Sequence, residues 1–540
     1  MAIEKGKFPT STASFRNIRL DGMYYVDKTA LAWRLADERK VVFLSRPRRF
    51  GKSMLLSTLA SYFGGERELF EGLRLQVLEE AKGANAWVKH PVLRFDFSKR
   101  GASVEGMQQI ILREVRKLAR RNGLTLESES ALEALDELFE RLDEAGFPRV
   151  AVLIDEYDSP ILDALVKGDD GLLDEVKTCL RNFYKTLKAS DESLRFLMAT
   201  GVSQLRQVGL FSGFNNIVDI SFDGEYNAIC GISEQEIHEY LSEQLIHMAN
   251  TKGWSEDKLM QELKYKYDGY RFSEKEEDVY NPYGLVHALC DCRLDDYWSL
   301  TGTMSSVDAL IPRYDALGVL NLDGQLRASR TELMQFSYEH SDPLAFLYQT
   351  GYLTIKGVEA DGQYRLDFPN QEVRESIMSI LAPRTLGIMR DGTLHGLQRN
   401  LVRALNGTDV KALEACIQAF LASLPHDHDG DTEEAWALRE CRYRDAVHLI
   451  FAGVRGDVRV EQIGAGGISD VEILGERMVV VLELKMKRGG MTATRALEQA
   501  VANSYTAKHI GGQKPVWAVG AVIGKKAHIE WEERCVWEGC

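Results

Sequence analysis

Residues 45–59, SRPRRFGKSMLLSTL, place a lysine and a hydroxyl group where they could bind the phosphates of a nucleotide. They follow an apolar run and lead into a helical pattern, and a phosphate loop needs this order of strand, tight turn and helix. Lys52 would reach the β- and γ-phosphates, and the hydroxyl of Ser53 would bind Mg²⁺. Arg46 stands where a glycine is usual, five positions before Gly51, so a solvated basic turn is the alternative interpretation.

An acidic pair at the end of an apolar strand could supply the hydrolytic chemistry. The run RVAVLIDE ends in Asp155 and Glu156, about a hundred residues after the loop. In a P-loop fold the first acid orients the water on the metal and the second polarises the attacking water. Another predicted strand ends in Thr200, which is a candidate sensor of the γ-phosphate. The alternative is an acidic strand end that caps the next helix.

A second group of residues near the C-terminus indicates metal-dependent phosphodiester cleavage. Side chains alternate along a strand, so Glu483 and Lys485 project together. If residues 470–474 and 478–485 form a hairpin, Asp470 can lie beside Glu483. Two carboxylates could hold Mg²⁺ while Lys485 orients or activates the attacking water. A solvated Glu-x-Lys strand is the alternative.

The elements that must position these residues alternate between strands and helices. Apolar runs predict strands at 41–45, 91–97, 149–156 and 194–201, and the helical patterns between them indicate a parallel sheet covered on both faces. Tyr267, Tyr270, Phe272 and Trp298 are expected to pack in a helical lid. The predicted regions are an ATPase core (1–225), the lid (226–300), a mostly helical middle domain (301–424), a linker (425–435) and a C-terminal domain (436–540). A winged-helix-like module is one interpretation of the middle domain.

Several long motifs resemble the AAA-ATPase-like family over about residues 5–380. They are YYVDKTALAWRL, FLSRPRRFGKSMLLSTLASYFGG, LIDEYDSPI, TGVSQLRQVGLFSGFNNIVDIS, YDGYRF, YNPYG, LYQTGYLTI and FPNQEVRES. In that family RPRRFGKS is the usual loop, so the resemblance implies a working site with Arg46 as the family's form. It implies nucleotide contacts by Arg48, Arg49, Phe50, Gly51, Lys52, Ser53, Met54 and Thr200. Ser53 and Asp155 are then the metal ligands and Glu156 is catalytic, while the choice of an arginine finger stays open.

Residues 436–535 resemble the PD-(D/E)XK nuclease fold in the order of their elements. The resemblance assigns Glu440 to the first helix, Asp470 and Glu483 to the metal, Lys485 to the catalytic lysine and Gln499 to the second helix. The family often has Gly-Arg-x-Asp before the aspartate, whereas this chain has GGISD. A degenerate domain that only folds or binds nucleic acid is the alternative.

Composition limits the class of protein. The 540 residues suggest three or four domains, and a net charge of −15, from 66 basic and 81 acidic residues, excludes a polybasic DNA-coating protein. The eight cysteines form no C-x-x-C pair, and no run is long and apolar enough for a membrane helix, so we expect a cytoplasmic protein without membrane contact.

Together these observations predict an α/β protein with a P-loop NTPase parallel sheet, a helical lid and middle region, and a C-terminal restriction-endonuclease-like α/β domain. We expect it to bind and hydrolyse ATP with Mg²⁺ and to cleave nucleic acid with Mg²⁺ or Mn²⁺, DNA rather than RNA. By analogy with other proteins that pair these domains, it would act in bacterial defence. A homo-oligomer is expected because P-loop ATPases of this type often build their sites between neighbouring subunits. The alternative is a signalling or scaffold ATPase whose nuclease-like domain is inactive and binds a partner or nucleic acid.

Overall fold

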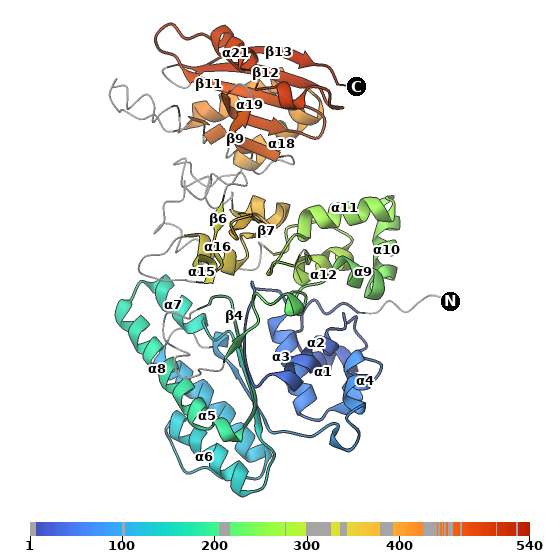
Figure 1. Ribbon diagram of the computed structural model, residues 1–540, viewed down its shortest axis with the longest axis vertical. Coiled ribbons are helices and arrows are strands. Elements are labelled where there is room, and N and C mark those ends of the chain that lie inside the picture. The colour runs from blue at the N-terminus through green and yellow to red at the C-terminus, as the bar shows by residue number, and fades with distance from the viewer. Residues whose placement is uncertain are drawn as a thin grey trace. The chain divides into compact units, whose positions relative to one another are not determined.

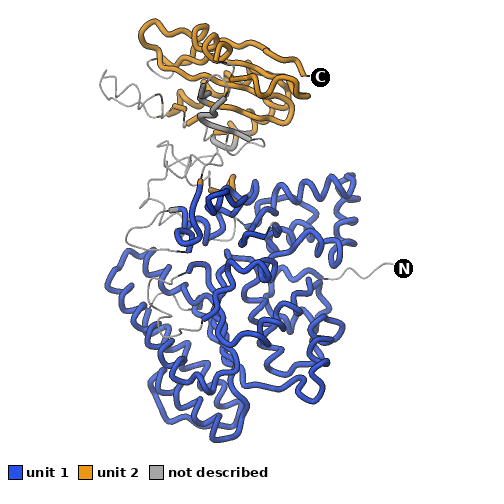
Figure 2. The backbone as a smooth tube through the Cα atoms, viewed as in Figure 1, with its two compact units in different colours: residues 1–314, 327–372 blue, residues 315–326, 373–540 orange. Residues whose placement is uncertain are grey.

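A computed structural model of the chain separates into two compact units (Figure 2). The first comprises residues 1–314 and 327–372, and the second comprises residues 315–326 and 373–540. The predicted middle domain, 301–424, therefore contributes to both units. The structure describes residues 7–99, 103–204, 217–275, 277–298, 326–334, 343–377, 393–424, 440, 443–444, 446–447, 450–451, 457–464, 467–503, 505–524 and 528–539. The predicted linker, 425–435, lies outside these residues.

The first unit is built on a parallel sheet of five strands in the order β2-β3-β4-β1-β5. These strands are β1 (Val41–Ser45), β2 (Val92–Asp96), β3 (Val150–Asp155), β4 (Leu194–Gly201) and β5 (Val218–Asp219). Every residue of β1 and β3 is buried, as expected for parallel strands that are covered on both faces. The four strands predicted from apolar runs are confirmed, and β5 was not predicted.

Helices cover both faces of this sheet (Figure 1). On one side lie α1 (Phe15–Leu20), α2 (Thr29–Glu38), α3 (Lys52–Phe63) and α4 (Arg74–Glu80). On the other lie α5 (Val104–Arg121), α6 (Ala131–Glu144), α7 (Ser159–Lys167) and α8 (Asp170–Ala189). The strand order separates β1 from β3 by β4, so the loop after β1 and the acids after β3 reach the same edge of the sheet on either side of the end of β4.

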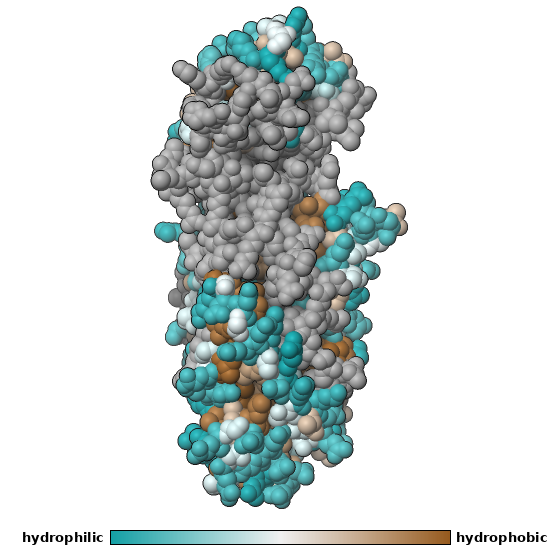
Figure 3. Space-filling view, turned by 90° about the vertical axis from the view of Figure 1, so that its left-hand side faces the viewer, coloured by the Kyte–Doolittle hydropathy of each residue, from teal (hydrophilic) through white to brown (hydrophobic). Residues whose placement is uncertain are grey.

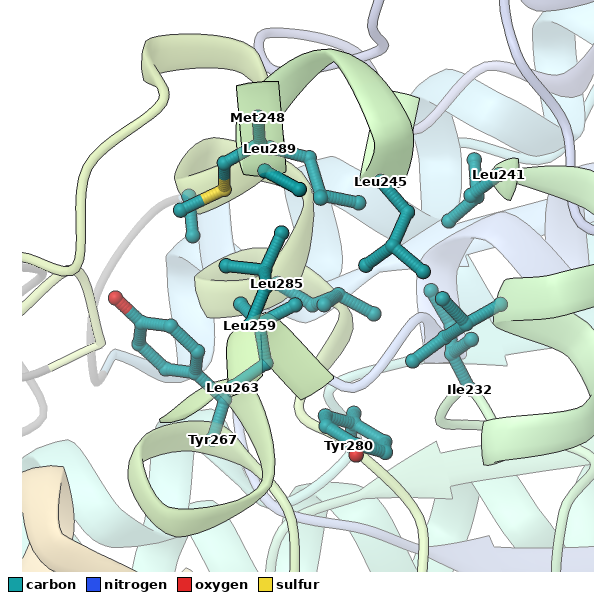
Figure 4. Packing of buried hydrophobic residues seen from close by; sticks show 13 residues of the cluster. Ile232, Leu241, Leu245, Met248, Leu259, Leu263, Tyr267, Tyr280, Leu285 and Leu289 are labelled. Carbon is teal, nitrogen blue, oxygen red and sulfur yellow. The ribbon is translucent and has the colours of Figure 1, made fainter. Parts of the chain in front are cut away.

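The predicted helical lid consists of α9 (Glu234–Tyr240), α10 (Ser242–Lys252), α11 (Glu256–Tyr267) and α12 (Pro282–Asp291). Figure 4 shows the leucines of α10, α11 and α12 turned toward a common core that also contains Tyr267. The motif YNPYG starts α12, because the side chain of Asn281 accepts hydrogen bonds from the N–H groups of Tyr283 and Gly284 and Pro282 needs no such partner. Tyr270 and Phe272, which were expected to pack in the lid, contact Phe50 of the phosphate loop, with ring centroids 4.6 and 5.4 Å from that of Phe50.

A smaller module completes the first unit. It contains β6 (Arg327–Ala328), α15 (Arg330–Met334), α16 (Pro343–Thr350), β7 (Thr354–Val358) and β8 (Tyr364–Asp367), with the sheet order β6-β8-β7. Residues 345–350 of α16 are all buried, so this helix packs inside the unit and does not present a surface. The winged-helix-like interpretation of the middle region stays a prediction.

The second unit contains a mixed sheet in the order β13-β12-β11-β10-β9. Its strands are β9 (Asp457–Gly464), β10 (Gly467–Leu474), β11 (Val479–Met486), β12 (Val516–Ile523) and β13 (Ile529–Trp537). Strands β9, β10 and β11 are antiparallel neighbours, and β12 is parallel to β11 after a crossover through α21 (Ala493–Ala502). Two further helices, α18 (Thr393–Asn406) and α19 (Val410–Ser423), belong to this unit. The predicted hairpin thus forms between β10 and β11.

Alanine at Gly520 is expected to destabilise the second unit by about 1–3 kcal/mol. A Cβ atom there would lie 2.3 Å from both the carbonyl oxygen of Ala493 and the backbone nitrogen of Leu497, so α21 would have to move away from β12. Urea denaturation of the full chain, followed by tryptophan fluorescence, measures the change. Gly396→Ala, at an open position of α18, is the control, and it should be stabilising by about 0.5–1 kcal/mol. Equal effects of the two substitutions would contradict the close packing of α21.

Exposed apolar side chains are scattered over the described surface. The most exposed large ones are Val77 and Leu20, at 72% and 64%. On the face in Figure 3, hydrophobic patches of the first unit are interrupted by hydrophilic residues. Within the part of the chain that the structure describes, none of the helices has the length and apolar character needed to cross a membrane.

Candidate functional sites

The phosphate loop has the backbone that anion binding requires. Arg49 and Gly51 have positive φ angles of 67° and 97°, and α3 begins at Lys52 directly after Gly51. Left-handed residues turn successive N–H groups toward one side of a loop, and the start of a helix adds its positive dipole end. The ammonium group of Lys52 donates to the carbonyl oxygens of Arg46 and Pro47, at 2.8 and 2.9 Å. Burial lowers the pKa of Lys52, and the nearby carboxylate of Glu156 opposes that shift.

Arg46 turns away from the phosphate side of its own loop. Its guanidinium group is buried and donates to the carbonyl oxygens of Ser45, Ser221 and Tyr226, at 2.9, 2.8 and 3.2 Å. It also lies over the ring of Phe272, 4.1 Å from the centroid. Arg46 therefore ties the start of the loop to the chain after β5 and to the YDGYRF segment. The sequence could not distinguish this arrangement from a solvated basic turn.

The ends of β3 and β4 bring Asp155 and Thr200 together. The Thr200 hydroxyl donates to Asp155 Oδ1 at 3.0 Å, and Asp155 Oδ2 lies 3.7 Å from the guanidinium group of Arg94. Arg94 also reaches the carbonyl oxygen of Ser53, at 3.5 Å. Asp155 is therefore held by the strands on either side of β3, and Arg94 links its carboxylate to the start of α3. Sequence reasoning missed Arg94, because it lies in a predicted strand without a motif.

Glu156 combines backbone strain with burial. Its φ angle is 48°, which a residue with a Cβ atom adopts only when the surroundings enforce it. Burial raises the pKa of its carboxyl group, while the positive charges of Lys52 and Arg48 act in the opposite direction. A strained, partly desolvated acid beside a phosphate loop is a candidate general base.

A cavity of about 770 Å³ adjoins these residues. Its volume is in the range of pockets that bind small molecules. Of the predicted site residues, its walls include Arg48, Arg49, Phe50, Gly51, Lys52, Ser53, Met54 and Glu156. Asp155 and Thr200 are not among the residues that line it.

Sequence reasoning missed another part of the cavity lining. Lys28 lies there and pairs with Glu236 of the lid at 2.5 Å, and Tyr283 and His287 of α12 contribute two neighbouring rings whose centroids are 4.4 Å apart and whose planes are tilted by 54°. The motifs YYVDKT and YNPYG contain two of these residues, Lys28 and Tyr283, and were the available signal. Their position against the loop depends on how the lid packs, which the motifs alone do not reveal.

In the second unit, Glu440, Glu483 and Lys485 come together. The ammonium group of Lys485 lies 3.1 Å from Glu483 Oε1 and 3.5 Å from Glu440 Oε1. Glu440 Oε2 also accepts a hydrogen bond from the backbone N–H of Met486 at 3.2 Å. Glu483 is 2% exposed, whereas Lys485 and Glu440 are partly exposed, so the cluster joins a buried carboxylate to half-buried charges and is not a fully solvated strand end.

The backbone register extends this cluster toward Asp470. Val471 pairs with Leu482, so the next pair of the antiparallel register joins Asp470 and Glu483. The side chain of Asp470 lies outside the described part of the structure. Gln499 lies on α21 and is half-buried. Among the described residues, no group of three or more His, Cys, Asp or Glu side chains could hold a metal ion by itself.

A second charged cluster of the second unit was not predicted. Glu472, on β10, is 1% exposed and lies 2.7 Å from the ammonium group of Lys508 and 3.2 Å from the imidazole of His509. In the antiparallel register of β10 and β11, Glu472 pairs with Val481, next to the pair of Val471 and Leu482. Paired charges of this kind stabilise a buried carboxylate, and the sequence offered no spacing that would have linked residues 472 and 508.

Comparisons with known proteins agree with the geometry of the first unit. Residues 9–211 match a protein family described as "Predicted AAA-ATPase". The chain is also similar to an uncharacterized protein in the vnfD 5′ region of Azotobacter chroococcum mcd 1. The two are 34% identical over 541 residues, which cover 97% of each chain. The similarity therefore extends through both units.

Proposed function

The chain belongs to the predicted AAA-ATPase family, and on that premise we propose that its first unit binds and hydrolyses ATP while its second unit cleaves phosphodiester bonds. One observation carries the first part: Lys52, Ser53 and Glu156 line the same cavity beside a left-handed phosphate loop. ATP binding requires Lys52, Ser53 and the left-handed turn, and ATP hydrolysis requires Glu156.

In this proposal each residue of the first site has a separate task. Lys52 exchanges the carbonyl oxygens of Arg46 and Pro47 for the β- and γ-phosphates. Ser53 and Asp155 would hold Mg²⁺, whose charge neutralises the phosphate oxygens, and their oxygen atoms suit this hard cation. Glu156 accepts a proton from the water that attacks the γ-phosphate, and Thr200 orients Asp155 through its hydroxyl group. Arg48 and Arg49 add positive charge to the cavity wall.

Alanine at Lys52 is expected to weaken ATP binding at least tenfold, because the charged contact to two phosphates is lost. Titration with a fluorescent ATP analogue in the presence of Mg²⁺ measures the affinity. Lys117→Ala, at an exposed position of α5, is the control and should bind as the wild type does. Unchanged affinity in Lys52→Ala would contradict the assigned site.

The proposal for the second unit rests on the cluster of Glu440, Glu483 and Lys485. Asp470 and Glu483 would hold Mg²⁺ or Mn²⁺, which would stabilise the charge that develops on the scissile phosphate. Lys485, held between the carboxylates of Glu483 and Glu440, would orient the attacking water. Gln499 on α21 is proposed to support this centre from the neighbouring helix. The order of elements β9-β10-β11-α21-β12 supports a PD-(D/E)XK nuclease-like fold.

DNA is the proposed substrate, ahead of RNA, and a homo-oligomer that acts in bacterial defence is the proposed context. The alternative is a signalling or scaffold ATPase whose second unit is inactive. A cleavage assay with Mg²⁺ or Mn²⁺ on single- and double-stranded DNA and RNA, with and without ATP, separates the two. ATP turnover without cleavage of any substrate would favour the scaffold.

A further inference from the structure

The module of residues 327–372 packs directly against the phosphate loop. Gly351 has a φ angle of 87°, and a Cβ atom on it would lie 2.6 Å from the ring of Pro47. Gln349 accepts a hydrogen bond from the N–H of Gln204 at 2.8 Å, and the side chain of Gln204 donates to the hydroxyl of Ser45 at 3.0 Å. Gly351 and Gln349 thus support the beginning of the phosphate loop, although they lie about 300 positions later in the sequence.

Trp298 links this module to the middle of the loop. Its indole N–H donates to the carbonyl oxygen of Arg48 at 3.3 Å, and its backbone N–H donates to the carboxylate of Glu372 at 2.5 Å. Its ring meets that of Tyr352 edge to face, with centroids 5.2 Å apart. Trp298 is completely buried and Glu372 is 1% exposed, so the bond between them is shielded from bulk water, whereas the bond to Arg48 is partly buried.

The carbonyl group of Arg48 matters because it belongs to the peptide unit that carries the N–H of Arg49. In a trans peptide these two groups point in opposite directions. Because the carbonyl oxygen of Arg48 accepts the hydrogen bond from the indole of Trp298, the N–H of Arg49 must point away from Trp298. Arg49 is also the loop residue with a φ angle of 67°. A peptide unit fixed in this way keeps the loop in its anion-binding form before any nucleotide arrives.

We propose that Trp298 and Glu372 are positioning residues for the phosphate loop. Neither lines the cavity: Glu372 accepts a hydrogen bond from Trp298, and Trp298 donates one to the peptide unit between Arg48 and Arg49. The expected effect on nucleotide affinity rests on the proposed ATP binding. The expected effect on the conformation of the phosphate loop does not depend on that proposal. The carboxylate that starts this chain of contacts is on the last residue of the first unit, immediately before Val373.

The substitution Trp298→Phe tests the proposal, because it removes the indole N–H and keeps an aromatic ring next to Tyr352. Hydrogen exchange of the peptide that covers residues 46–53, in the full chain without nucleotide, should become roughly three- to tenfold faster. Affinity for ATP and ADP should fall by a similar factor, while affinity for AMP should stay unchanged. A general loss of structure would instead alter the binding of all three nucleotides.

Trp254→Phe is the matched control, since Trp254 lies in the same lid and its ring contacts the ammonium groups of Lys252 and Lys258. It should leave exchange of the loop unchanged. Wild-type exchange in Trp298→Phe, or an equal change in Trp254→Phe, would overturn the proposal. If the wild type binds no ATP, the proposed function fails, and the exchange experiment still decides the role of Trp298. Should Trp298→Phe not fold, Glu372→Gln, which weakens the bond to the backbone N–H of Trp298, is expected to shift exchange in the same direction by a smaller factor.

Discussion

Glutamine at Glu156 is expected to lower the turnover number for ATP at least a hundredfold while ATP still binds. The substitution keeps the size and position of the side chain and removes the group that accepts the proton of the attacking water. General base catalysis typically contributes 10²- to 10⁴-fold, and a hundredfold loss corresponds to about 2.7 kcal/mol in the activation barrier. Phosphate release under saturating ATP measures turnover, and equilibrium titration measures binding.

The pH profile gives this prediction a second test. Because burial raises the pKa of Glu156 above its ordinary value near 4.5, the ionised base is lost at a higher pH than usual for a glutamate. Turnover of the wild type should therefore fall as the pH is lowered through that raised pKa, and the residual activity of Glu156→Gln should lack this acid limb. Glu133→Gln, at an exposed position of α6, should behave as the wild type does. Normal turnover in Glu156→Gln would assign the base to another residue.

Glutamine at Glu483 is expected to reduce cleavage of nucleic acid about a thousandfold and to leave ATP turnover unchanged. The carboxylate is the described ligand candidate of the second unit and also the partner of Lys485 at 3.1 Å. Neutralising the Glu483 carboxylate removes negative charge from the proposed metal site and removes the ion-pair partner of Lys485. The metal would contribute several kcal/mol of transition-state stabilisation, which is the reason for the large expected effect. Cleavage of labelled DNA, measured alongside phosphate release from ATP, separates the two units within one sample.

Glu532→Gln is the matched control for this second prediction. Glu532 is an exposed acid on β13, two strands away from Glu483 in the same sheet, and its substitution should change neither activity. Cleavage at the wild-type rate by Glu483→Gln would disprove the assigned centre. A wild-type protein that turns over ATP and cleaves none of the four substrate types would support the scaffold function instead.

Much of the sheet architecture could be predicted because burial leaves a local signal. Strands β1, β3 and β4 are covered on both faces, so they appear in the sequence as continuous apolar runs that end in polar residues. The spacing of 13 positions from Asp470 to Glu483 fits a hairpin, and the register of β10 and β11 agrees with that spacing. The hydrogen bond from Thr200 to Asp155 follows from the parallel pairing of β3 and β4.

The remaining contacts could not be predicted because they join residues far apart in the chain. Arg46 binds the carbonyl oxygen of Ser221, and Arg48 is held by Trp298, 250 residues later. Part of the cavity lining comes from Lys28 and from α12, and the position of α12 depends on the packing of the lid. No periodicity or spacing encodes such pairs, since each partner alone is compatible with a solvated surface.

The sequence by itself determined the order of strands and helices, the loop with Lys52 and Ser53, the acids at the end of β3 and the Glu-x-Lys strand of the second unit. These features are short, and their physical cause is local: alternation along a strand, a left-handed turn, or burial of an apolar run. Only the tertiary structure decided that Arg46 faces the protein instead of the phosphates and that residues 327–372 hold the loop. Those outcomes depend on which distant surfaces exclude water together, and that is a property of the folded chain.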